Sequence, residues 1–157
     1  MSTLRVRLAR AEDARVLWEW ANDPLVLAMA FDPKPLPWDP YRRWFLERMA
    51  DGRSWFAILE TDAAQPLGQV RLDVHAEGLE LDYSIDARYR GRGYGASLLT
   101  DALVLARTRW SAETRLIARV LTTNPRSLAV CQRAGFAITA CGSEAERAYV
   151  RLERRLG

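Results

Sequence analysis

Residues 90–97 read Arg90-Gly91-Arg92-Gly93-Tyr94-Gly95-Ala96-Ser97 and form the most informative stretch of this chain. A strand pattern ends just before the stretch and a helical pattern begins inside it, so we expect a strand-to-helix turn. Glycines at alternate positions let the backbone turn tightly and approach a ligand closely. The free amides and the dipole of the following helix favour an anion, and Arg90 and Arg92 add positive charge. The sequence therefore predicts a phosphate cradle.

Two other phosphate-binding motifs fit this stretch less well. A Walker loop ends in Gly-Lys followed by Ser or Thr, and the stretch contains no lysine. A dinucleotide fingerprint is matched by Gly91, Gly93 and Ala96, but that motif belongs early in a βαβ unit, whereas a run of predicted strands precedes this loop. A glycine-rich turn without a ligand is the remaining alternative.

Periodic patterns on both sides of the loop predict a single domain over residues 1–157. We expect an α+β (mixed α/β) fold with a central, mostly antiparallel sheet of about seven strands and about four helices. The triplet Asn22-Asp23-Pro24 is expected to stop the first helix. The expected strands are Leu4–Leu8, Trp55–Leu59, Gly68–Val74, Leu79–Ile85, Leu116–Val120, Phe136–Ala140 and Ala148–Leu152, and the expected helices are Glu12–Asn22, Asp39–Asp51, Tyr94 to about Trp110, and Asn124–Gly135.

The composition fits a globular protein without a nucleic-acid or membrane partner. Hydrophobic residues make up 49 % of the 157 residues and charged residues 27 %, which is close to average. The net charge is only +3, and the arginines are interspersed with 20 acidic residues rather than gathered in a stripe. No run approaches the roughly 18 apolar residues of a membrane span, and the N-terminus lacks the apolar run of a signal peptide. We therefore expect a cytoplasmic location.

The cysteines and the single histidine do not indicate a metal site or a disulfide. Cys131 and Cys141 form neither a Cys-x-x-Cys pair nor part of a larger framework. His75 falls in a predicted hairpin turn and is expected at the surface. We expect both thiols to be reduced.

A second motif opens the last predicted helix and reads Asn124-Pro125-Arg126-Ser127-Leu128-Ala129-Val130-Cys131-Gln132-Arg133-Ala134-Gly135-Phe136. Together with Arg90-x-x-Gly93-x-Gly95, it resembles the two signatures of the GNAT superfamily of N-acyltransferases, on the expected elements and in the expected order. The resemblance extends from Leu4 to Leu152. It implies a GNAT-like fold, acetyl-CoA as co-substrate, no metal, and direct acetyl transfer to a primary amine.

The resemblance also implies where coenzyme A binds. The amides of Arg92 to Ala96 would receive the pyrophosphate, and the pantetheine arm would pair with exposed strand edge near Asp86. The arm enters where the fourth and fifth strands splay apart. The implied cofactor-binding residues are Ser84, Ile85, Arg90, Gly91, Arg92, Gly93, Tyr94, Gly95, Ala96, Asn124 and Ser127. For Asn124, and similarly for Ser127, a role in capping the helix is the alternative, because Asn before Pro is a good cap.

One position departs from the family pattern. Where the family often has a tyrosine that protonates the leaving thiolate, this chain has Cys131. A thiol with a pKa of about 8.5 could donate that proton, and a small buried core cysteine is the alternative. Tyr83 and Tyr94 are other phenols near the loop, but the sequence places neither within reach.

A carboxylate is needed to take a proton from the attacking amine. Glu80 and Asp82 lie on one face of the strand that leads to the loop, where relatives place such a base. We prefer Glu80. Two solvent-facing acids on an alternating strand are the alternative.

The acceptor site of the superfamily is built mainly by the first two helices and the loop between them. In this chain that region carries Trp18, Trp38 and Trp44, which could stack a planar base or sugar ring, and Arg42 and Arg43, which could hold a phosphate. Most of these aromatic residues could equally belong to the core.

Several stretches resemble one branch of the superfamily. Leu17–Pro24, Trp38, Arg43–Phe45 and Gly68–Asp73 are similar to acetyltransferases of bacterial surface-sugar pathways, such as those acting on a nucleotide-linked 4-amino sugar. That branch usually has an arginine after Asn-Asp-Pro, where this chain has Leu25-Val26-Leu27. The expected partner is therefore a small-molecule amine, possibly a sugar nucleotide.

Other functions remain open. The segment Leu8–Ala14 also resembles the branch that acetylates the N-termini of ribosomal proteins. A non-catalytic sensor that binds acyl-CoA is a further alternative, because the usual tyrosine is missing. We expect a monomer or a homodimer, with Ala148–Leu152 as a possible pairing edge.

Overall fold

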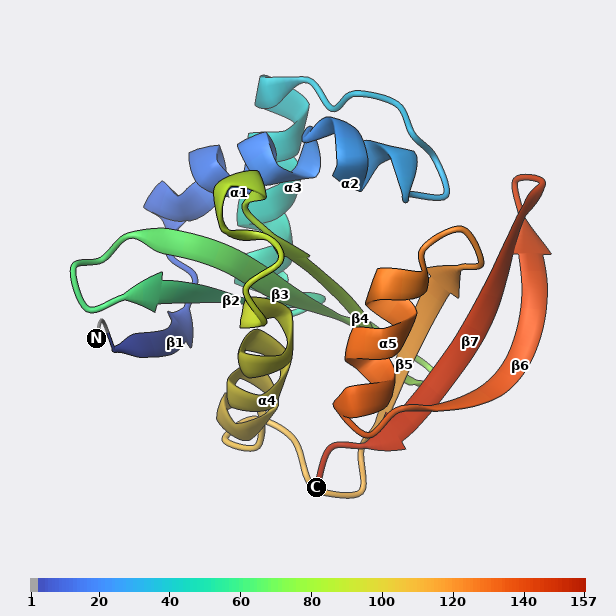
Figure 1. The fold of residues 1–157 in the computed structure, drawn as a ribbon. Helices are drawn as coiled ribbons and strands as arrows, with labels where there is room; N and C mark the ends of the chain where they lie inside the picture. The colour runs from blue at the N-terminus through green and yellow to red at the C-terminus, as the bar shows by residue number, and fades with distance from the viewer. Residues whose placement is uncertain (1–2) are drawn as a thin grey trace.

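One seven-stranded sheet organises the computed structural model, which describes residues 3–157 (Figure 1). The strand order is β1-β2-β3-β4-β5-β7-β6, and neighbours are antiparallel except for the parallel pair β4 and β5. The predicted α+β class and mostly antiparallel sheet are confirmed. The strands are β1 (Leu4–Leu8), β2 (Ser54–Thr61), β3 (Pro66–His75), β4 (Gly78–Ile85), β5 (Arg115–Leu121), β6 (Ala137–Glu144) and β7 (Arg147–Arg155).

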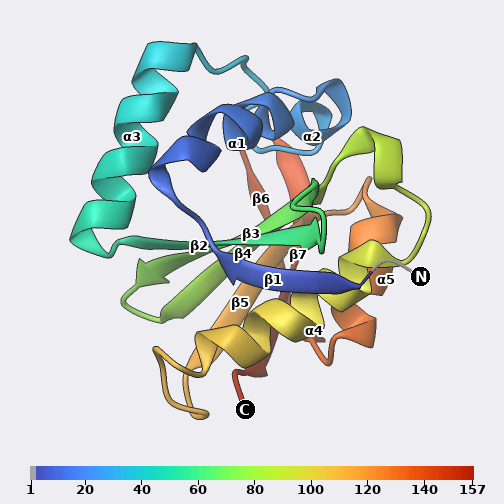
Figure 2. The same ribbon diagram turned by 90° about the vertical axis from the view of Figure 1, so that its left-hand side faces the viewer.

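Helices cover both faces of the sheet (Figure 2). The first three α-helices lie on one face, and the last two lie side by side on the other. Short 3-10 turns precede α1 and α4. The bounds are η1 (Ala11–Asp13), α1 (Ala14–Ala21), α2 (Pro24–Ala28), α3 (Trp38–Asp51), η2 (Ala87–Tyr89), α4 (Tyr94–Ala106) and α5 (Pro125–Arg133).

Alternation along β2 separates two hydrophobic cores. Phe56 and Ile58 pack with α1 and α3, whereas Ala57 and Leu59 belong to the core under α4. Phe45 of α3 is fully buried and meets Phe56 edge-on, with ring centroids 4.9 Å apart. The central strands β3 and β4 are closed by apolar side chains on the face toward α4 and present polar side chains toward α1. The packed face makes the two strands a firm support for a site.

β4 and β5 diverge soon after they meet. They pair only at Leu79 with Leu116 and at Glu80 with Ile117. From there β4 continues to Ile85 without pairing to β5, and Figure 1 shows the two strands spreading apart. The predicted splay between the fourth and fifth strands is confirmed. It leaves the end of β4 with a backbone edge to which an extended ligand can pair.

As predicted, α1 ends at Asn22-Asp23-Pro24, but the same residues also begin α2. The Asp23 Oδ1 atom accepts hydrogen bonds from the amides of Leu25 (2.9 Å) and Val26 (3.3 Å), and Pro24 takes the first helical position. Aspartate as a cap followed by proline is a strong helix start. Residues 3–157 consequently contain five α-helices rather than about four.

The C-terminal hairpin also differs from the prediction. β7 lies between β5 and β6, so the expectation that Ala148–Leu152 forms a pairing edge is wrong, and β6 is the edge strand. The hairpin turns at Ala145 and Glu146, which have φ angles of 50° and 63°. Neither residue type is typical of a left-handed turn, so no local signal marked this turn in the sequence. The predicted strands Phe136–Ala140 and Ala148–Leu152 are therefore shorter than β6 and β7.

Candidate active site

The loop of residues 90–97 has the backbone of an anion cradle. Gly91 and Gly93 have φ angles of 77° and 80°, the left-handed region that favours glycine. Gly93 immediately precedes α4, and no side chain caps this helix start. A Cβ atom at either glycine would meet no heavy atom within 4 Å. Free amides in the first turn, formed by Tyr94, Gly95 and Ala96, and open space beside them are what bound phosphate requires.

The start of α5 lies beside the start of α4. In Figure 1 both helices run in the same direction, with their N-terminal ends at the opening between β4 and β5. The Asn124 Oδ1 atom accepts a hydrogen bond from the Ser127 amide at 3.2 Å, so Asn124 does cap α5. Two positive helix ends therefore face one opening. A contact of Asn124 or Ser127 with coenzyme A stays a prediction.

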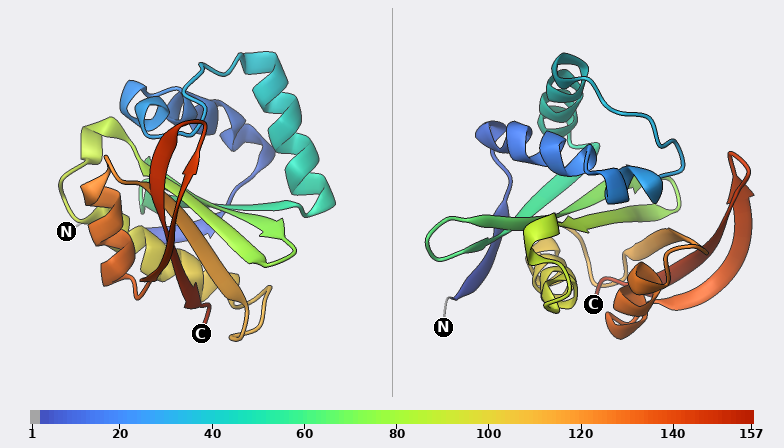
Figure 3. Two further views of the ribbon diagram at one scale, coloured as in Figure 1. Left: turned by 90° about the vertical axis from the view of Figure 1, so that its right-hand side faces the viewer. Right: turned by 45° about the horizontal axis from the view of Figure 1, so that its top comes forward.

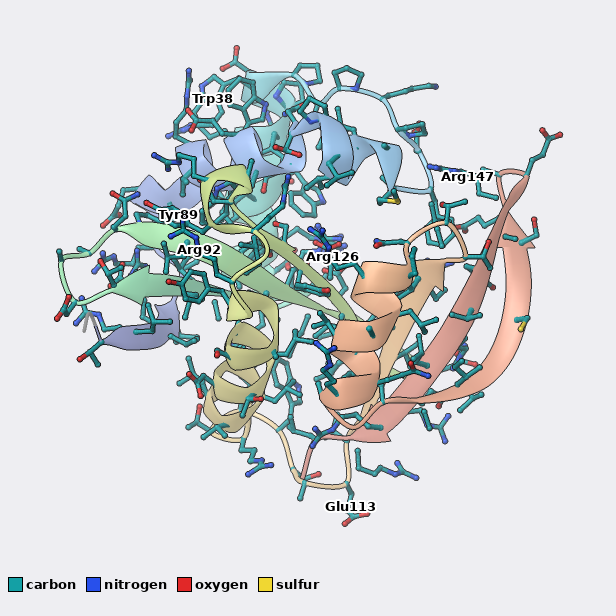
Figure 4. All side chains as sticks on the ribbon, in the orientation of Figure 1. Trp38, Tyr89, Arg92, Glu113, Arg126 and Arg147 are labelled. Carbon is teal, nitrogen blue, oxygen red and sulfur yellow. The ribbon has the colours of Figure 1, made fainter. Side chains whose placement is uncertain are left out.

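The two loop arginines have different surroundings. The Arg90 Nη2 atom lies 3.1 Å from Asp23 Oδ1, and its Nε atom donates to the Ile85 carbonyl at 3.0 Å. Arg92 is exposed, with its guanidinium 5.7 Å from the centroid of the Tyr89 ring (Figure 4). Arg92 is therefore free to meet an anion, whereas Arg90 already has two protein partners.

Arg126 is a candidate that the sequence analysis did not single out. It lies in the first turn of α5 and is exposed, and Figure 4 shows it at the opening between α5 and β4. Burial raises the pKa of the Tyr83 phenol, and the charge of Arg126 opposes part of that effect. An arginine between Asn124 and Ser127 was the signal available in the sequence.

Tyr83 lies directly beneath the loop, next to Cys131. A Cβ atom on Gly95 would be 3.6 Å from the Tyr83 ring. The Ser127 side chain opposes part of the effect of burial on the pKa of the Tyr83 phenol and of the Cys131 thiol. Burial raises the pKa of Tyr83 to about 12 and that of Cys131, which is only 1 % exposed, to about 11. Both groups therefore carry their protons near neutral pH. The fold places Tyr83 beneath the loop, a position that could not be predicted from the sequence.

The two candidate carboxylates have different partners. The Glu80 Oε1 atom accepts a hydrogen bond from Arg119 Nε at 2.9 Å, and its Oε2 atom lies 3.3 Å from the half-exposed His75. The Asp82 Oδ2 atom accepts a hydrogen bond from Gln69 Nε2 at 3.1 Å. The same amide nitrogen lies 3.2 Å from the hydroxyl of the buried Ser84. Gln69 therefore links Asp82 to Ser84, in the part of β4 that does not pair with β5.

A cavity of about 170 Å³, here named the β4 cavity, lies between the first helices and the middle strands. Its charged lining consists of two acidic and two basic residues, Asp32, Asp82, Lys34 and Arg71. A larger hollow of about 480 Å³ lies elsewhere, near Gly52 and Arg109. The remaining residues of the β4 cavity are Leu17, Ala21, Val26, Leu27, Ala30, Leu36, Tyr41, Phe56, Gln69 and Ser84.

The three predicted acceptor-binding tryptophans lie outside the lining of the β4 cavity. Trp18 and Trp38 meet edge-on with centroids 5.5 Å apart, and the Trp18 Nε1 atom donates to the Leu36 carbonyl at 2.6 Å. Trp44 packs against Phe56, and the Arg71 guanidinium lies 5.4 Å from its ring centroid. These side chains support the cavity walls, and their contact with a substrate remains a prediction.

A family model described as the acetyltransferase (GNAT) domain matches residues 3–137 of this sequence. The chain belongs to the GNAT acetyltransferase family. It is therefore an N-acetyltransferase, and acetyl-CoA is its co-substrate. The loop of residues 90–97 and the start of α5 both fall within the matched region.

Solved structures of other GNAT enzymes share this fold. A spermidine N-acetyltransferase from Vibrio cholerae, in complex with CoA and spermine, has a TM-score of 0.84 at 17 % identity and covers 98 % of this chain and 95 % of its own. Aminoglycoside acetyltransferase AAC(6')-Ib with coenzyme A and kanamycin has a TM-score of 0.80 at 16 % identity, with 98 % and 95 % coverage. An N-acetyltransferase from Staphylococcus aureus Mu50 has a TM-score of 0.81 at 19 % identity, with 99 % and 100 % coverage. No curated protein sequence matches the chain.

Residues 3–157 of this GNAT enzyme show neither a metal-binding cluster nor a membrane-spanning helix. Within that range, no group of three or more His, Cys, Asp or Glu side chains could hold a metal ion. No helix in the same range is long and apolar enough to cross a membrane. Cys131 and Cys141 are both free thiols.

Proposed function

We propose that this GNAT enzyme acetylates the primary amine of a nucleotide-linked amino sugar. The observation that carries the proposal is the lining of the β4 cavity, where Asp82, Gln69 and Ser84 offer hydrogen-bonding groups to a compact polar ring. The cavity would hold the sugar but is too small for a whole nucleotide. The nucleotide would extend past the exposed Lys34, whose charge suits a phosphate.

The balance of charges in the β4 cavity favours an amino sugar over a polyamine as the acceptor. Two carboxylates and two cations line it, so it has no excess of negative charge to attract a polycation. Arg71 keeps its charge because Asp82 and Asp73 outweigh its burial and raise its pKa. An amine with a neutral or anionic body fits this balance better than a chain of ammonium groups.

The nearby aromatic side chains remain part of the proposal. Trp18 and Trp38 are half-buried and are tied to the cavity wall through the Trp18 bond to Leu36. A nucleotide that leaves the cavity beside Leu36 would therefore meet an aromatic surface on which a base can stack. We propose Trp18 and Trp38 for this contact, with Trp44 as support.

The proposed reaction begins at the splay of β4 and β5. The amine nitrogen attacks the thioester carbonyl carbon, one amine proton moves to a carboxylate, and the carbon–sulfur bond breaks to release a thiolate. We propose Asp82 as the proton acceptor, because it lines the β4 cavity whereas Glu80 is held by Arg119. The thiolate then takes a proton from Tyr83 or Cys131, which both lie under the cofactor loop.

The test is an acceptor panel in which release of free thiol from acetyl-CoA is measured. The panel contains a UDP-linked amino sugar, the free amino sugar, spermidine, kanamycin and a peptide with a free N-terminus. We expect kcat/KM to be highest for the UDP-linked amino sugar, by about tenfold or more because of its phosphate contacts. The Asp82→Asn variant reports the background of hydrolysis.

Each other outcome assigns a different function. A maximum with spermidine or kanamycin would overturn the amino-sugar proposal in favour of a polycationic amine. A maximum with the peptide would indicate N-terminal protein acetylation. Calorimetric binding of acetyl-CoA without turnover of any amine would indicate a sensor.

Assembly and location complete the proposal. β6 is an edge strand whose residues from Ala137 to Ser143 carry no charge, so a homodimer would pair through this edge; a monomer is the alternative. Light scattering decides between the two states, and proline at Thr139 should abolish the dimer if β6 forms it. We expect a cytoplasmic location, because the enzyme needs a compartment that supplies acetyl-CoA.

A further inference from the structure

The tip of the β6–β7 hairpin holds a segment near the N-terminus. Residues 28–36, here named the 28–36 segment, run from the end of α2 toward α3. The Arg147 guanidinium donates to the carbonyls of Ala28 and Ala30, 119 and 117 residues away in sequence (Figure 4). Because Ala28 is the last residue of α2, the arginine satisfies carbonyls at the negative end of that helix.

A layer of aromatic and charged side chains reinforces this contact. Phe31 meets Tyr149 of β7 edge-on, with ring centroids 5.4 Å apart. The Arg119 guanidinium lies 4.7 Å from the Phe31 centroid and 5.5 Å from that of Tyr149. Arg119 is itself held by Glu80 at 2.9 Å and by Glu144 of β6 at 3.1 Å. Figure 3 shows the hairpin tip reaching toward the loop after α2.

The 28–36 segment forms one wall of the β4 cavity. Four of its residues line the cavity, namely Ala30, Asp32, Lys34 and Leu36. Its far end is anchored through Leu36, whose amide donates to Asn22 Oδ1 at 2.7 Å and whose carbonyl accepts from Trp18. Its near end is anchored by Arg147. The position of this wall therefore depends on a side chain from the other end of the chain.

We propose that Arg147 is a positioning residue that sets acceptor selectivity by holding the 28–36 segment against the β4 cavity. The proposal rests on the proposed function, because it takes that cavity as the acceptor site. With Arg147 in place, the wall is fixed and the cavity admits a compact amine. Without it, the α2 carbonyls lose their partner, the near end of the wall is released, and bulkier amines can enter.

The test uses Arg147→Ala, with Arg147→Lys as the conservative variant. Loss of two charge-assisted hydrogen bonds should raise KM for the best amine of the panel about tenfold, with kcat and acetyl-CoA affinity unchanged. The preference for that amine over bulkier amines should fall by a similar factor. Lysine keeps the charge but not the two-pronged geometry, so it should restore part of the loss.

The matched control is Arg151→Ala on the same strand. Arg151 pairs with Glu77 at 3.1 Å, away from the 28–36 segment, so its loss should leave KM and selectivity unchanged. Amide hydrogen exchange gives a readout that needs no acceptor. Arg147→Ala should increase exchange in residues 24–37 and leave the strands of the sheet unaffected.

Three outcomes decide the proposal. Faster exchange together with lower selectivity in Arg147→Ala supports it. Unchanged exchange overturns it, and so does faster exchange with unchanged selectivity. Failure of the proposed function is a separate result, because it appears in the native enzyme as a different preferred amine.

Discussion

The proposed cofactor half and the proposed acceptor half of this site are built in different ways. The cofactor half consists of residues 90–97 and 124–131, two short stretches at the starts of α4 and α5. The acceptor half, the β4 cavity, takes its walls from seven segments between Leu17 and Ser84 and is held by Arg147 from β7. Local backbone chemistry can form the first half, whereas the second exists only when distant elements pack. Substitutions in the two halves should therefore affect different substrates.

Asp82 lies where the two halves meet, and its removal should have the largest effect. Asp82→Asn removes the proposed proton acceptor, so kcat at saturating substrates should fall about 10³-fold. Glu80→Gln should change kcat less than about threefold, because Glu80 is bound to Arg119. Initial rates of thiol release measure both. The reverse result would place the base at Glu80, as the sequence analysis preferred.

Tyr83 tests whether the cofactor half also carries chemistry. Tyr83→Phe should lower kcat about 10²-fold, because the phenol is proposed to protonate the leaving thiolate. Acetyl-CoA affinity, measured by calorimetry, should not change. Cys131→Ala should retain kcat within about threefold, because the thiol is buried in the core. A larger loss for Cys131→Ala than for Tyr83→Phe would assign the proton to the thiol.

Asp86 joins the two halves. Its carboxylate accepts a hydrogen bond from Trp20 Nε1 of α1 at 2.9 Å. The pKa of Asp86 is lowered from 3.8 to about 2, first by the Arg88 side chain, against the effect of burial. A lowered folded-state pKa means that the carboxylate stabilises the fold above about pH 4 and that this stability is lost as pH falls toward about 2.

The variant Asp86→Asn tests this link. It should reduce the free energy of unfolding by about 2 kcal/mol at pH 7, and the difference from the native protein should shrink below about pH 3. Denaturant unfolding at the two pH values measures it. If the two proteins differ in free energy of unfolding by the same amount at both pH values, the charge of Asp86 does not stabilise its contact with Trp20.

The two loop arginines should give the smallest and most specific effects. Arg92→Ala should weaken acetyl-CoA binding about tenfold, because Arg92 is free to bind a phosphate. Arg90→Ala should instead act mainly on the acceptor KM, because Arg90 holds Asp23 at the start of α2. Calorimetry and acceptor kinetics separate the two effects. Equal losses of acetyl-CoA affinity in the two variants would show that Arg90 acts on the cofactor, which would contradict its assignment to the acceptor side.

Sequence reasoning was accurate where neighbouring residues determine the geometry. The turn at Gly91 and Gly93 was predicted from local spacing, and the cap at Asn124 was one of the two roles left open for that residue. The splay of β4 from β5 was instead implied by the family resemblance. It was incomplete where one short signal has two meanings, as at Asn22-Asp23-Pro24, where α1 ends and α2 begins. It was wrong about the sheet edge, because strand order depends on a pairing between β5 and β7 that no local pattern encodes.

The sequence by itself determined the family, the fold class and the turn of residues 90–97, because glycines and helix starts act through the backbone of adjacent residues. Only the tertiary structure decided which side chains share the acceptor half. It placed Asp82 in the β4 cavity, Tyr83 beside Cys131, and Arg147 on the carbonyls of α2. The physical reason is that these contacts join residues of different elements. Their distances are therefore set by packing and strand order rather than by spacing along the chain.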